Sequence, residues 1–428
     1  MSYQETLEYI HSVKWQGSKP GLSRTRELLS KLGNPEKKLR FVHIAGTNGK
    51  GSTAACIASV LKQAGYKTGL YTSPYINKFN ERMQVNGDQI SDAELEELTN
   101  EIRPHAESMK DLPTEFELIT ALAMRFFEYK QCDVVVLEVG MGGELDSTNV
   151  IDVPDVAVIT AIGLDHTKDL GPSLGDIAMA KAGIIKKGGT VAIYGGPEEV
   201  LSVFQNVCDE KDADLYLADF SALKIRKCDL TGCTFNYGEL RNLFLPLAGT
   251  YQPYNAALAI TALKLSCTKG YRISNEDIIS GISNVKWPGR FEIISEDPVV
   301  ILDGAHNPHG IIATAQSLKD HFGDKKIVFV LGVMADKDVK NMISHIAPLA
   351  KCFVAVKPEN PRAMEPEALA KIFVECGLNA YPSNSIVEGV AKAFVLSGSN
   401  GIICALGSLY FSNDIRTAVK KAKNATTL

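Results

Sequence analysis

Several features that would define a protein class at once are missing from the 428-residue sequence. It contains no apolar segment as long as the roughly 20 residues of a membrane-spanning helix. It begins without the basic start and apolar stretch of a signal peptide, and it has no internal repeat. The formal net charge of −5 gives no general attraction to nucleic acids or anionic membranes, although a local basic cleft is compatible with it. We therefore expect neither a membrane nor a nucleic acid as a partner.

Cysteine is used without paired spacing. Nine cysteines are scattered along the chain, and the closest two, Cys228 and Cys233, form no familiar zinc pattern. We expect reduced cysteines that serve as small core residues, which is typical of a cytoplasmic protein. The length, together with 45% hydrophobic and 22% charged residues, predicts an ordinary globular protein with two domains.

Short apolar runs alternate with helical patterns through most of the chain. Runs rich in Val and Ile without polar alternation are typical of strands covered on both faces, as in a parallel sheet between helices. The first group of such runs lies at 41–45, 67–72, 133–139, 156–162 and 190–195. Between them, the pairs Ser91/Glu94 and Thr114/Glu117 read as capping boxes at helix starts.

A glycine-rich turn, GTNGKGS, joins the first strand to a helical pattern. Its candidate phosphate-binding residues are Thr47, Asn48, Gly49, Lys50, Gly51 and Ser52. Glycines let backbone N–H groups close around an anion at a helix start, and a lysine adds a charge that reaches the outer phosphates. In the usual pattern a Ser or Thr follows the lysine directly, but here Gly51 intervenes. The turn predicts a nucleotide site of the P-loop type, with a plain connecting turn as the alternative.

Polar residues also follow other strands of the same predicted sheet. Ser73 follows one strand, Glu138 lies near the end of another, and Asp165 and His166 follow a third. The carboxyl ends of parallel strands share one edge, which is where open α/β sheets bind ligands. Hydroxyl, carboxylate and imidazole groups beside phosphates suit Mg²⁺. Singly, each residue has an ordinary explanation: an ion pair for Glu138, a turn for Ser73 and a helix cap for His166.

The pattern of apolar and turn-forming residues changes in the second half of the chain. Residues 222–250 read as short hairpin strands, and the turn-rich stretch 284–292 contains Pro288-Gly289, which interrupts regular structure. A second set of strand-like runs lies at 299–303, 326–332, 352–356 and 401–407. We therefore predict an α/β protein in which residues 1–287 form a P-loop parallel-sheet ATPase domain that includes the small antiparallel region. Residues 288–428 are predicted to form a smaller Rossmann-like α/β domain.

Four other candidates carry less information alone. Lys181 lies in a helical pattern, and the residues by themselves favour a surface lysine. Asp303 and His306 come just past a strand, where an Asx-type turn is the ordinary alternative. Arg290, after Pro288-Gly289, is a candidate contact for an anion between the domains.

Taken together, these residues resemble the folylpolyglutamate synthase/dihydrofolate synthase family, a branch of the Mur-ligase-like ATP-dependent amide ligases. The stretches GTNGKGS and EVGMGGELDSTN are the most specific. The other matching stretches, in the family's order, are LYTSPYINKFNERM, which lies between these two, and then GLDHTKDLG, KAGIIK, YQPYNAA, WPGRFE, LDGAHNPHG and LGVMADKD. The C-terminal stretches are less specific.

The resemblance implies roles for particular residues. The implied magnesium ligands are Ser73, Glu138, His166 and Lys181, with Lys181 carbamylated at its ε-nitrogen. The implied nucleotide contacts outside the turn are Asn255, Arg290, Asp303 and His306. The implied folate-binding residues are Ser73, Pro74, Tyr75 and Phe79. The implied catalytic residues are Lys50, His166, Lys181, Asp303 and His306.

The resemblance also implies the reaction. ATP would phosphorylate a folate or dihydropteroate carboxylate, and the amine of L-glutamate would attack the acyl phosphate, with Mg²⁺ as cofactor. The residues do not decide between folylpolyglutamate synthesis alone and dihydrofolate synthesis as well. The alternatives are another Mur-type amide ligase, disfavoured because little chain precedes the turn, and a non-ligase P-loop ATPase. We expect a cytoplasmic monomer.

Overall fold

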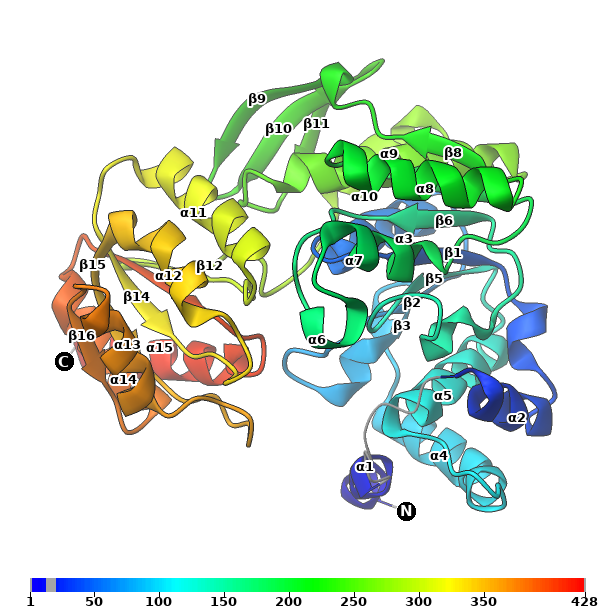
Figure 1. The fold of residues 1–428 in the computed structure, drawn as a ribbon, viewed down its shortest axis with the longest axis horizontal. Coiled ribbons are helices and arrows are strands. Elements are labelled where there is room, and N and C mark those ends of the chain that lie inside the picture. The colour runs from blue at the N-terminus through cyan, green and yellow to red at the C-terminus, as the bar shows by residue number, and fades with distance from the viewer. Residues whose placement is uncertain (1, 13–20, 427–428) are drawn as a thin grey trace. The chain divides into compact units, whose positions relative to one another are not determined.

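The computed structural model describes residues 2–12 and 21–426, which form two compact units (Figure 1). Unit 1 comprises Met1–Leu223 and Tyr254–Val285, and unit 2 comprises Lys224–Pro253 and Lys286–Leu428. The predicted domain division after residue 287 lies next to the division after Val285. Residues 224–253 differ from the prediction, because they group with the second unit instead of the first. Most of this segment forms its own small sheet, and its end packs in the core of unit 2 through Ala248 and Tyr251.

Unit 1 is built on an eight-stranded sheet with the order β4-β3-β2-β5-β1-β6-β7-β8. Its strands are β1 (Phe41–Ala45), β2 (Thr68–Tyr71), β3 (Met83–Val85), β4 (Asp88–Gln89), β5 (Val134–Glu138), β6 (Val156–Ile159), β7 (Thr190–Ile193) and β8 (Asp214–Leu217). The six strands from β2 to β8 in this order are parallel. The two edge strands β3 and β4 are antiparallel, and the sequence pattern did not predict them.

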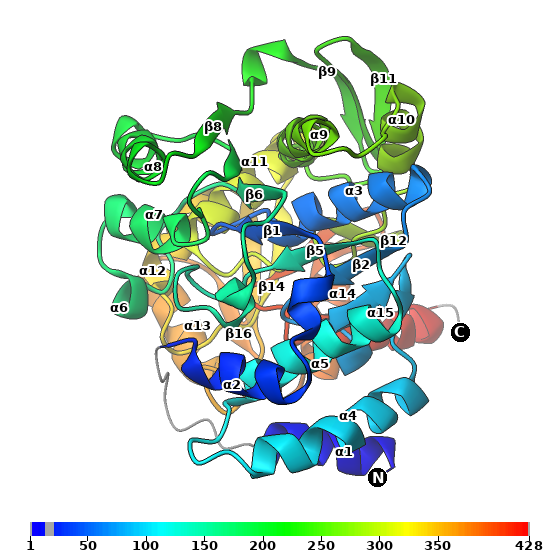
Figure 2. The same cartoon turned by 90° about the vertical axis from the view of Figure 1, so that its right-hand side faces the viewer.

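Helices cover both faces of this sheet (Figure 2). The helices are α1 (Tyr3–Ser12), α2 (Ser23–Lys31), α3 (Lys50–Gln63), α4 (Asp92–Glu107), α5 (Glu115–Tyr129), α6 (Thr167–Leu170), α7 (Leu174–Ala182), α8 (Glu198–Glu210), α9 (Gln252–Thr268) and α10 (Asn275–Ser283). Side chains of α4 and α5 form one core with Val135 and Leu137, and those of α7 and α8 form another with Ile159 and Ile193. The opposite face is covered by α3, against which α10 packs.

Both predicted capping boxes are present. The side chain of Ser91 accepts a hydrogen bond from the backbone N–H of Glu94 at the start of α4. Thr114 does the same for Glu117 at the start of α5. In each case the glutamate side chain bonds back to the cap residue's N–H, so two unpaired helix donors are satisfied.

Unit 2 contains a six-stranded sheet with the order β12-β13-β17-β14-β15-β16. Its strands are β12 (Glu292–Glu296), β13 (Val299–Leu302), β14 (Ile327–Leu331), β15 (Ala350–Ala355), β16 (Ala380–Pro382) and β17 (Ile402–Leu406). Strand β12 is antiparallel to β13, and the remaining pairs are parallel. The helices of the unit are α11 (Pro308–Phe322), α12 (Val339–Ile346), α13 (Pro366–Glu375), α14 (Ile386–Ser397) and α15 (Ser412–Thr426).

The predicted hairpin strands form a separate three-stranded sheet with the order β11-β10-β9. Its strands are β9 (Leu223–Asp229), β10 (Gly232–Tyr237) and β11 (Leu240–Leu245). A disulfide joins Cys228 to Cys233 across the β9–β10 turn. The expectation of reduced cysteines is therefore wrong for this pair, because the hairpin brings together two thiols whose sequence spacing matched no known pattern. Five of the seven free cysteines are buried: Cys56, Cys132, Cys208, Cys352 and Cys404.

Within residues 2–12 and 21–426, no helix combines the length and the apolar character needed to cross a bilayer.

His43 is a buried polar residue in the central strand β1. Its Nε2 lies 2.9 Å from the hydroxyl oxygen of Thr148, which in turn donates to Asp146 Oδ1 at 2.6 Å. Since the Thr148 hydroxyl donates to Asp146, His43 is a neutral imidazole that donates from Nε2. Burial is the main cause that lowers the pKa of His43 to about 3.

This depressed pKa predicts a pH-dependent stability. Unfolded His43 takes up a proton near pH 6.5, whereas folded His43 does not until about pH 3, so its contribution is lost as the pH falls through that window. Between pH 6.5 and 4.5 the wild-type protein should lose about 2 kcal/mol more unfolding free energy than His43→Gln. Denaturant titration at both pH values measures this, with His105→Gln as the control. Equal pH slopes for wild type and His43→Gln would contradict the assignment.

Candidate functional site

The turn between β1 and α3 runs too close to its neighbours to admit side chains at two glycines. At Gly46, where φ is 144°, a Cβ atom would lie 1.8 Å from the Thr160 hydroxyl oxygen. At Gly49, where φ is 90°, it would lie 2.5 Å from Asn255 Oδ1. Both positions therefore require glycine for conformation and for space. The structure also brings Asn255 to the turn, as the resemblance implied.

Hydrogen bonds hold the turn against the segment that follows β6. The backbone N–H groups of Thr47 and Asn48 donate to the Ala161 carbonyl at 3.0 and 3.2 Å. The Thr47 hydroxyl donates to the Gly163 carbonyl at 3.0 Å, and Gly163 N–H lies 3.1 Å from the same hydroxyl oxygen. Strand β6 neighbours β1 in the sheet. These hydrogen bonds therefore hold the turn at the carboxyl edge of the sheet. The sequence pattern did not predict them.

Lys50 begins α3 and folds back over the turn. Its Nζ atom donates to the carbonyls of Gly46 at 3.1 Å and Thr47 at 3.4 Å. The ammonium group thus lies above the backbone that would surround a phosphate, at a helix N-terminus whose N–H groups favour anions. Ser52, two residues further on, is buried at 2% exposure.

Ser73 and Glu138 meet beside this turn. Glu138 pairs in register with Ile44 of β1, and its carboxylate Oε2 accepts a hydrogen bond from the Ser73 N–H at 3.2 Å. The Glu138 side chain is only 4% exposed. The Glu138 carboxylate is thereby held at the edge of the sheet, next to Ser73 and one strand away from the strand that leads to Lys50.

Asp165 and His166 follow β6 on the other side of β1. Asp165 Oδ1 accepts from the His166 backbone N–H at 2.9 Å, and His166 Nε2 lies 3.9 Å from Asp165 Oδ2. His166 has a left-handed φ of 50° and occupies the N-cap position of the short helix α6, but its side chain makes no capping hydrogen bond there. Its side chain is 44% exposed, which leaves the imidazole accessible to a ligand.

Lys181 corrects the interpretation made from its sequence pattern. It lies in α7 and is only 5% exposed, so it is not a surface lysine. Burial and the positive charge of Lys50 lower the pKa of Lys181 to about 7, against the opposing effect of Asp165 and Asp146. Helical periodicity alone could not reveal this, because the loop around Gly143 packs on the Lys181 backbone. A Cβ on Gly143 would lie 2.9 Å from the Lys181 carbonyl oxygen.

The segment from Ser73 to Arg82 carries the predicted folate-binding residues. The rings of Tyr75 and Phe79 lie 6.0 Å apart, and the Arg82 guanidinium lies 5.2 Å from the Tyr75 ring centre and 5.7 Å from that of Phe79. The Nε and Nη1 atoms of Arg82 are buried without hydrogen-bond partners in the described part of the chain. Arg82 was not among the predicted residues, because one arginine in a polar stretch carries no signal by itself.

In unit 2, Asp303 is surrounded by donors. Its Oδ1 accepts from Ala305 N–H at 2.7 Å and the Thr314 hydroxyl at 3.1 Å. Its Oδ2 accepts from Phe291 N–H at 2.7 Å and the Tyr251 hydroxyl at 3.1 Å. Burial and then the Asp303 charge raise the pKa of Tyr251 well above its usual value, so its phenol remains a donor. These four bonds favour a positioning role for Asp303, with direct nucleotide contact remaining a prediction.

Arg290 and His306 lie on segments that Asp303 holds. A Cβ on Gly304 would be 2.0 Å from Arg290 Nη1, and the Gly304 N–H donates to the Gly289 carbonyl at 2.9 Å. His306 Nδ1 lies 2.8 Å from the Gly304 carbonyl oxygen. The predicted residues of the second half are therefore gathered at the end of β13.

Comparison with known proteins decides the family. The Mur ligase middle domain matches residues 44–263, and the Mur ligase glutamate ligase domain matches residues 289–409. A dihydrofolate synthase/folylpolyglutamate synthase of Bacillus subtilis is 39% identical over 98% of this chain and 99% of its own length. A folylpolyglutamate synthase of Lacticaseibacillus casei is 37% identical over 99% of this chain and 100% of its own length.

The chain belongs to the folylpolyglutamate synthase/dihydrofolate synthase family of Mur ligases. The structure of Mycobacterium tuberculosis folylpolyglutamate synthase, complexed with ADP and AMPPCP, superposes with a TM-score of 0.88 at 30% identity, covering 97% of this chain and 98% of that one. An Escherichia coli member in complex with DHPP and ADP gives 0.87 at 31% identity, covering 99% of both chains.

Membership in this family confirms the predicted α/β fold and the predicted ATP-dependent ligase. The roles of the individual site residues stay predictions. The structure does bring together, in unit 1, the turn around Lys50, the Ser73–Glu138 pair, Asn255 and Lys181.

The side chains at the sheet edge differ from those of a metal site built from protein ligands alone. Within residues 2–12 and 21–426, no three His, Cys, Asp or Glu side chains are grouped so as to hold a metal ion. Mg²⁺ beside nucleotide phosphates needs only one or two protein ligands, since waters and phosphate oxygens supply the rest. The adjacent Ser73 and Glu138 therefore fit this ion.

The close approach at Gly49 predicts a specific loss of nucleotide binding. In Gly49→Ala, relieving the 2.5 Å contact with Asn255 must move the turn or the asparagine. The affinity for ADP, measured by calorimetry, should fall at least tenfold.

Gly65→Ala is the matched control, because Gly65 has nearly the same φ, 89°, but no atom within 4 Å of the added Cβ. It should lose about 1 kcal/mol of stability and bind ADP within twofold of wild type. Unchanged ADP affinity in Gly49→Ala would show that the turn does not hold the nucleotide.

Proposed function

We propose that the protein joins L-glutamate to the carboxylate of a folate, driven by ATP. The observation that carries the proposal is the meeting of Lys50, the Ser73–Glu138 pair and buried Lys181 around one glycine-rich turn. The names of the Bacillus subtilis and Lacticaseibacillus casei relatives support the choice of substrates.

The proposed reaction has two steps. A carboxylate oxygen of the folate attacks the γ-phosphorus of ATP, the bond to the β,γ-bridging oxygen breaks, and ADP leaves. The glutamate nitrogen then attacks the carbonyl carbon of the acyl phosphate, phosphate leaves, and the amine loses a proton. Phosphorylation is needed because a carboxylate has no good leaving group. Lys50 and the turn's N–H groups would stabilise the charge of the transferring phosphoryl group.

Magnesium belongs to this proposal. Ser73 and Glu138 would hold one ion, with His166 and a carbamylated Lys181 at a second position. The ion would supply electrostatic stabilisation of the phosphate oxygens when bound. The protein's own contribution is to fix Glu138 beside Ser73 through a 3.2 Å hydrogen bond.

The acid substrate would lie along the segment from Ser73 to Arg82. Pro74, Tyr75 and Phe79 supply apolar contacts, and the buried Arg82 guanidinium, with two unpartnered nitrogens among the described residues, supports an anionic group there. Burying a guanidinium without hydrogen-bond partners is unfavourable, and pairing it with a carboxylate relieves that cost.

Residues of unit 2 complete the proposal. Arg290 and His306 would orient the nucleotide and the incoming glutamate, with Asp303 fixing the backbone that carries them. The stretch 284–292 would serve as the hinge for closure before chemistry, because acyl phosphates hydrolyse in water. We further propose a cytoplasmic monomer. The seven free cysteines support this location, whereas the Cys228–Cys233 disulfide is uncommon there.

Dihydrofolate synthesis is the second candidate activity. It is favoured by the dual name of the Bacillus subtilis relative and by the Escherichia coli complex with DHPP and ADP. A mass-spectrometric assay containing ATP, Mg²⁺ and glutamate, with dihydropteroate in one reaction and a reduced folate in another, separates the two activities. Absence of a glutamate-adduct mass in both would overturn the proposed function.

Lys50→Ala should lower the rate of glutamate-dependent ADP release by about 10²–10³-fold, comparable to the loss of one strong transition-state donor. Lys62→Ala removes an exposed lysine from the other end of α3 and should leave this rate within twofold. Retention of the wild-type rate in Lys50→Ala would refute the assignment of this turn to the transferring phosphate.

Carbamylation of Lys181 gives a further prediction. Carbon dioxide reacts with a free amine, and a pKa of about 7 leaves roughly half of this amine unprotonated at neutral pH. The full-length protein in ¹³C-bicarbonate should show a carbamate carbon signal that is absent in Lys181→Ala and retained in Lys62→Ala. Acetate should partly restore the ligase activity of Lys181→Ala. A carbamate signal that persists in Lys181→Ala would place the modification elsewhere.

A further inference from the structure

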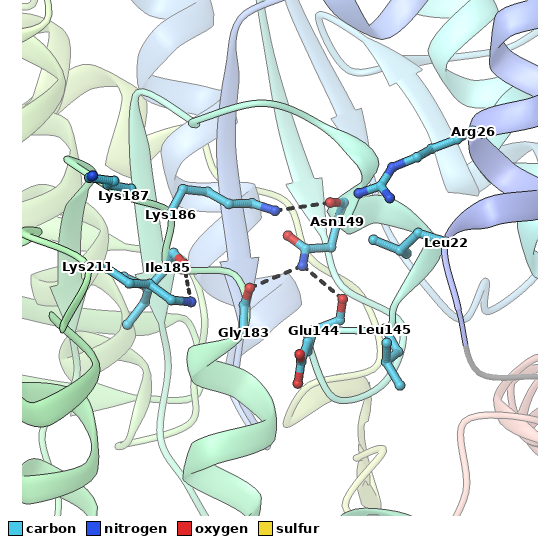
Figure 3. A pocket seen from close by; sticks show the side chains of 10 residues that line it. All are labelled: Leu22, Arg26, Glu144, Leu145, Asn149, Gly183, Ile185, Lys186, Lys187 and Lys211. Atoms are coloured by element: carbon cyan, nitrogen blue, oxygen red, sulfur yellow. Dashed lines mark hydrogen bonds between the residues drawn. The ribbon is translucent and has the colours of Figure 1, made fainter.

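A second candidate anion site lies in unit 1. A pocket of about 450 Å³ is lined by four cations, with Lys186, Lys187 and Lys211 entering from one side and Arg26 from the other, and Glu144 is the acidic member of its lining (Figure 3). Its lining includes none of the residues assigned above to the nucleotide, the metal or the acid substrate. The chain as a whole is acidic, with a formal net charge of −5. Four cations around one hollow are therefore a local departure from the overall charge.

The side that carries the lysines is fixed by backbone contacts. Lys211, just after α8, donates from Nζ to the Ile185 carbonyl at 2.7 Å. The Gly188 N–H donates to the Lys211 carbonyl at 2.9 Å. These bonds hold Lys211 against the turn between α7 and β7, which also carries Lys186 and Lys187.

Asn149 fixes the opposite wall. Its Nδ2 donates to the backbone carbonyls of Glu144 at 3.0 Å and Gly183 at 3.1 Å. The backbone carbonyl of Asn149 accepts from Lys186 Nζ at 3.2 Å. Asn149 is only 3% exposed. The pocket is thus shaped by buried hydrogen bonds, and Lys186 is held at its wall (Figure 3).

The cations of the pocket are not neutralised by ion pairs. Lys186 and Lys211 bond to neutral carbonyl oxygens, which leaves donors on each ammonium group. Among residues 2–12 and 21–426, the Arg26 guanidinium and the Lys187 ammonium have no hydrogen-bond or ion-pair partner. Burial and then the charges of Lys211 and Arg26 lower the pKa of Lys186, against an opposing effect of Asp152. The cations are therefore close enough to repel one another, and a bound anion would relieve that repulsion.

We propose that this pocket binds a small polyanion, whose phosphate or carboxylate groups are held by Arg26, Lys186, Lys187 and Lys211. The proposal goes beyond the ligase reaction, since none of these side chains takes part in the chemistry described above. One wall also belongs to a segment that carries a predicted site residue, because Lys186 lies five residues after Lys181 in the chain.

Calorimetry on the full chain tests the proposal with two probes, tripolyphosphate and a linear tri-γ-glutamate. Saturating ADP is present throughout, so that the turn around Lys50 is occupied. At least one probe should bind saturably, with one site per chain. The probe that binds more tightly identifies phosphate or carboxylate as the recognised group.

Two double variants locate the site. Arg26→Gln with Lys187→Gln should weaken binding at least tenfold, and neither side chain makes a hydrogen bond to another residue that the structure describes. Lys37→Gln with Lys110→Gln removes the same charge from exposed positions of unit 1 outside the pocket and should change binding less than twofold. The proposal is overturned if neither probe binds saturably, or if the two double variants weaken binding equally.

Discussion

The backbone of the turn between β1 and α3 approaches Thr160 and Asn255 so closely that Gly46 and Gly49 admit no side chain. The rest of the site depends on this packing. It leaves the start of α3 open for an anion while Thr47 and Asn48 are tied to the segment after β6. Because β5 and β6 flank β1, fixing the turn also fixes its distance from Glu138 and Asp165.

Electrostatics at this edge follow from burial. Lys181 lies in α7 at 5% exposure, near the positive charge of Lys50, and both effects favour its neutral amine. A neutral buried amine is chemically available, which an exposed lysine at neutral pH is not. Glu138 is a buried carboxylate on the same edge, and it accepts a hydrogen bond from the Ser73 N–H. The edge therefore combines a buried lysine with a lowered pKa, a buried carboxylate and a glycine-rich turn within one sheet.

Much of this was predictable from short patterns. The Val- and Ile-rich runs located the parallel strands, the pairs Ser91/Glu94 and Thr114/Glu117 located two helix starts, and the glycines located the turn. The sequence patterns could not predict a residue's surroundings where these depend on contacts with residues distant in sequence. The burial of Lys181 depends on the loop at Gly143, and the four donors to Asp303 come from residues 251, 291, 305 and 314. The Cys228–Cys233 disulfide and the antiparallel edge strands β3 and β4 were likewise invisible, because neither has a distinctive spacing or run length.

The central claim is that the turn around Lys50 presents the terminal phosphoryl group of ATP to a carboxylate, not to water. Oxygen transfer tests this directly. A folate substrate labelled with ¹⁸O in its reacting carboxylate is turned over with ATP, Mg²⁺ and glutamate, and the released phosphate is analysed by mass spectrometry. One ¹⁸O atom is expected in each phosphate, carried from the acid through the acyl phosphate. Phosphate that contains oxygen from the solvent and none from the labelled acid would contradict it.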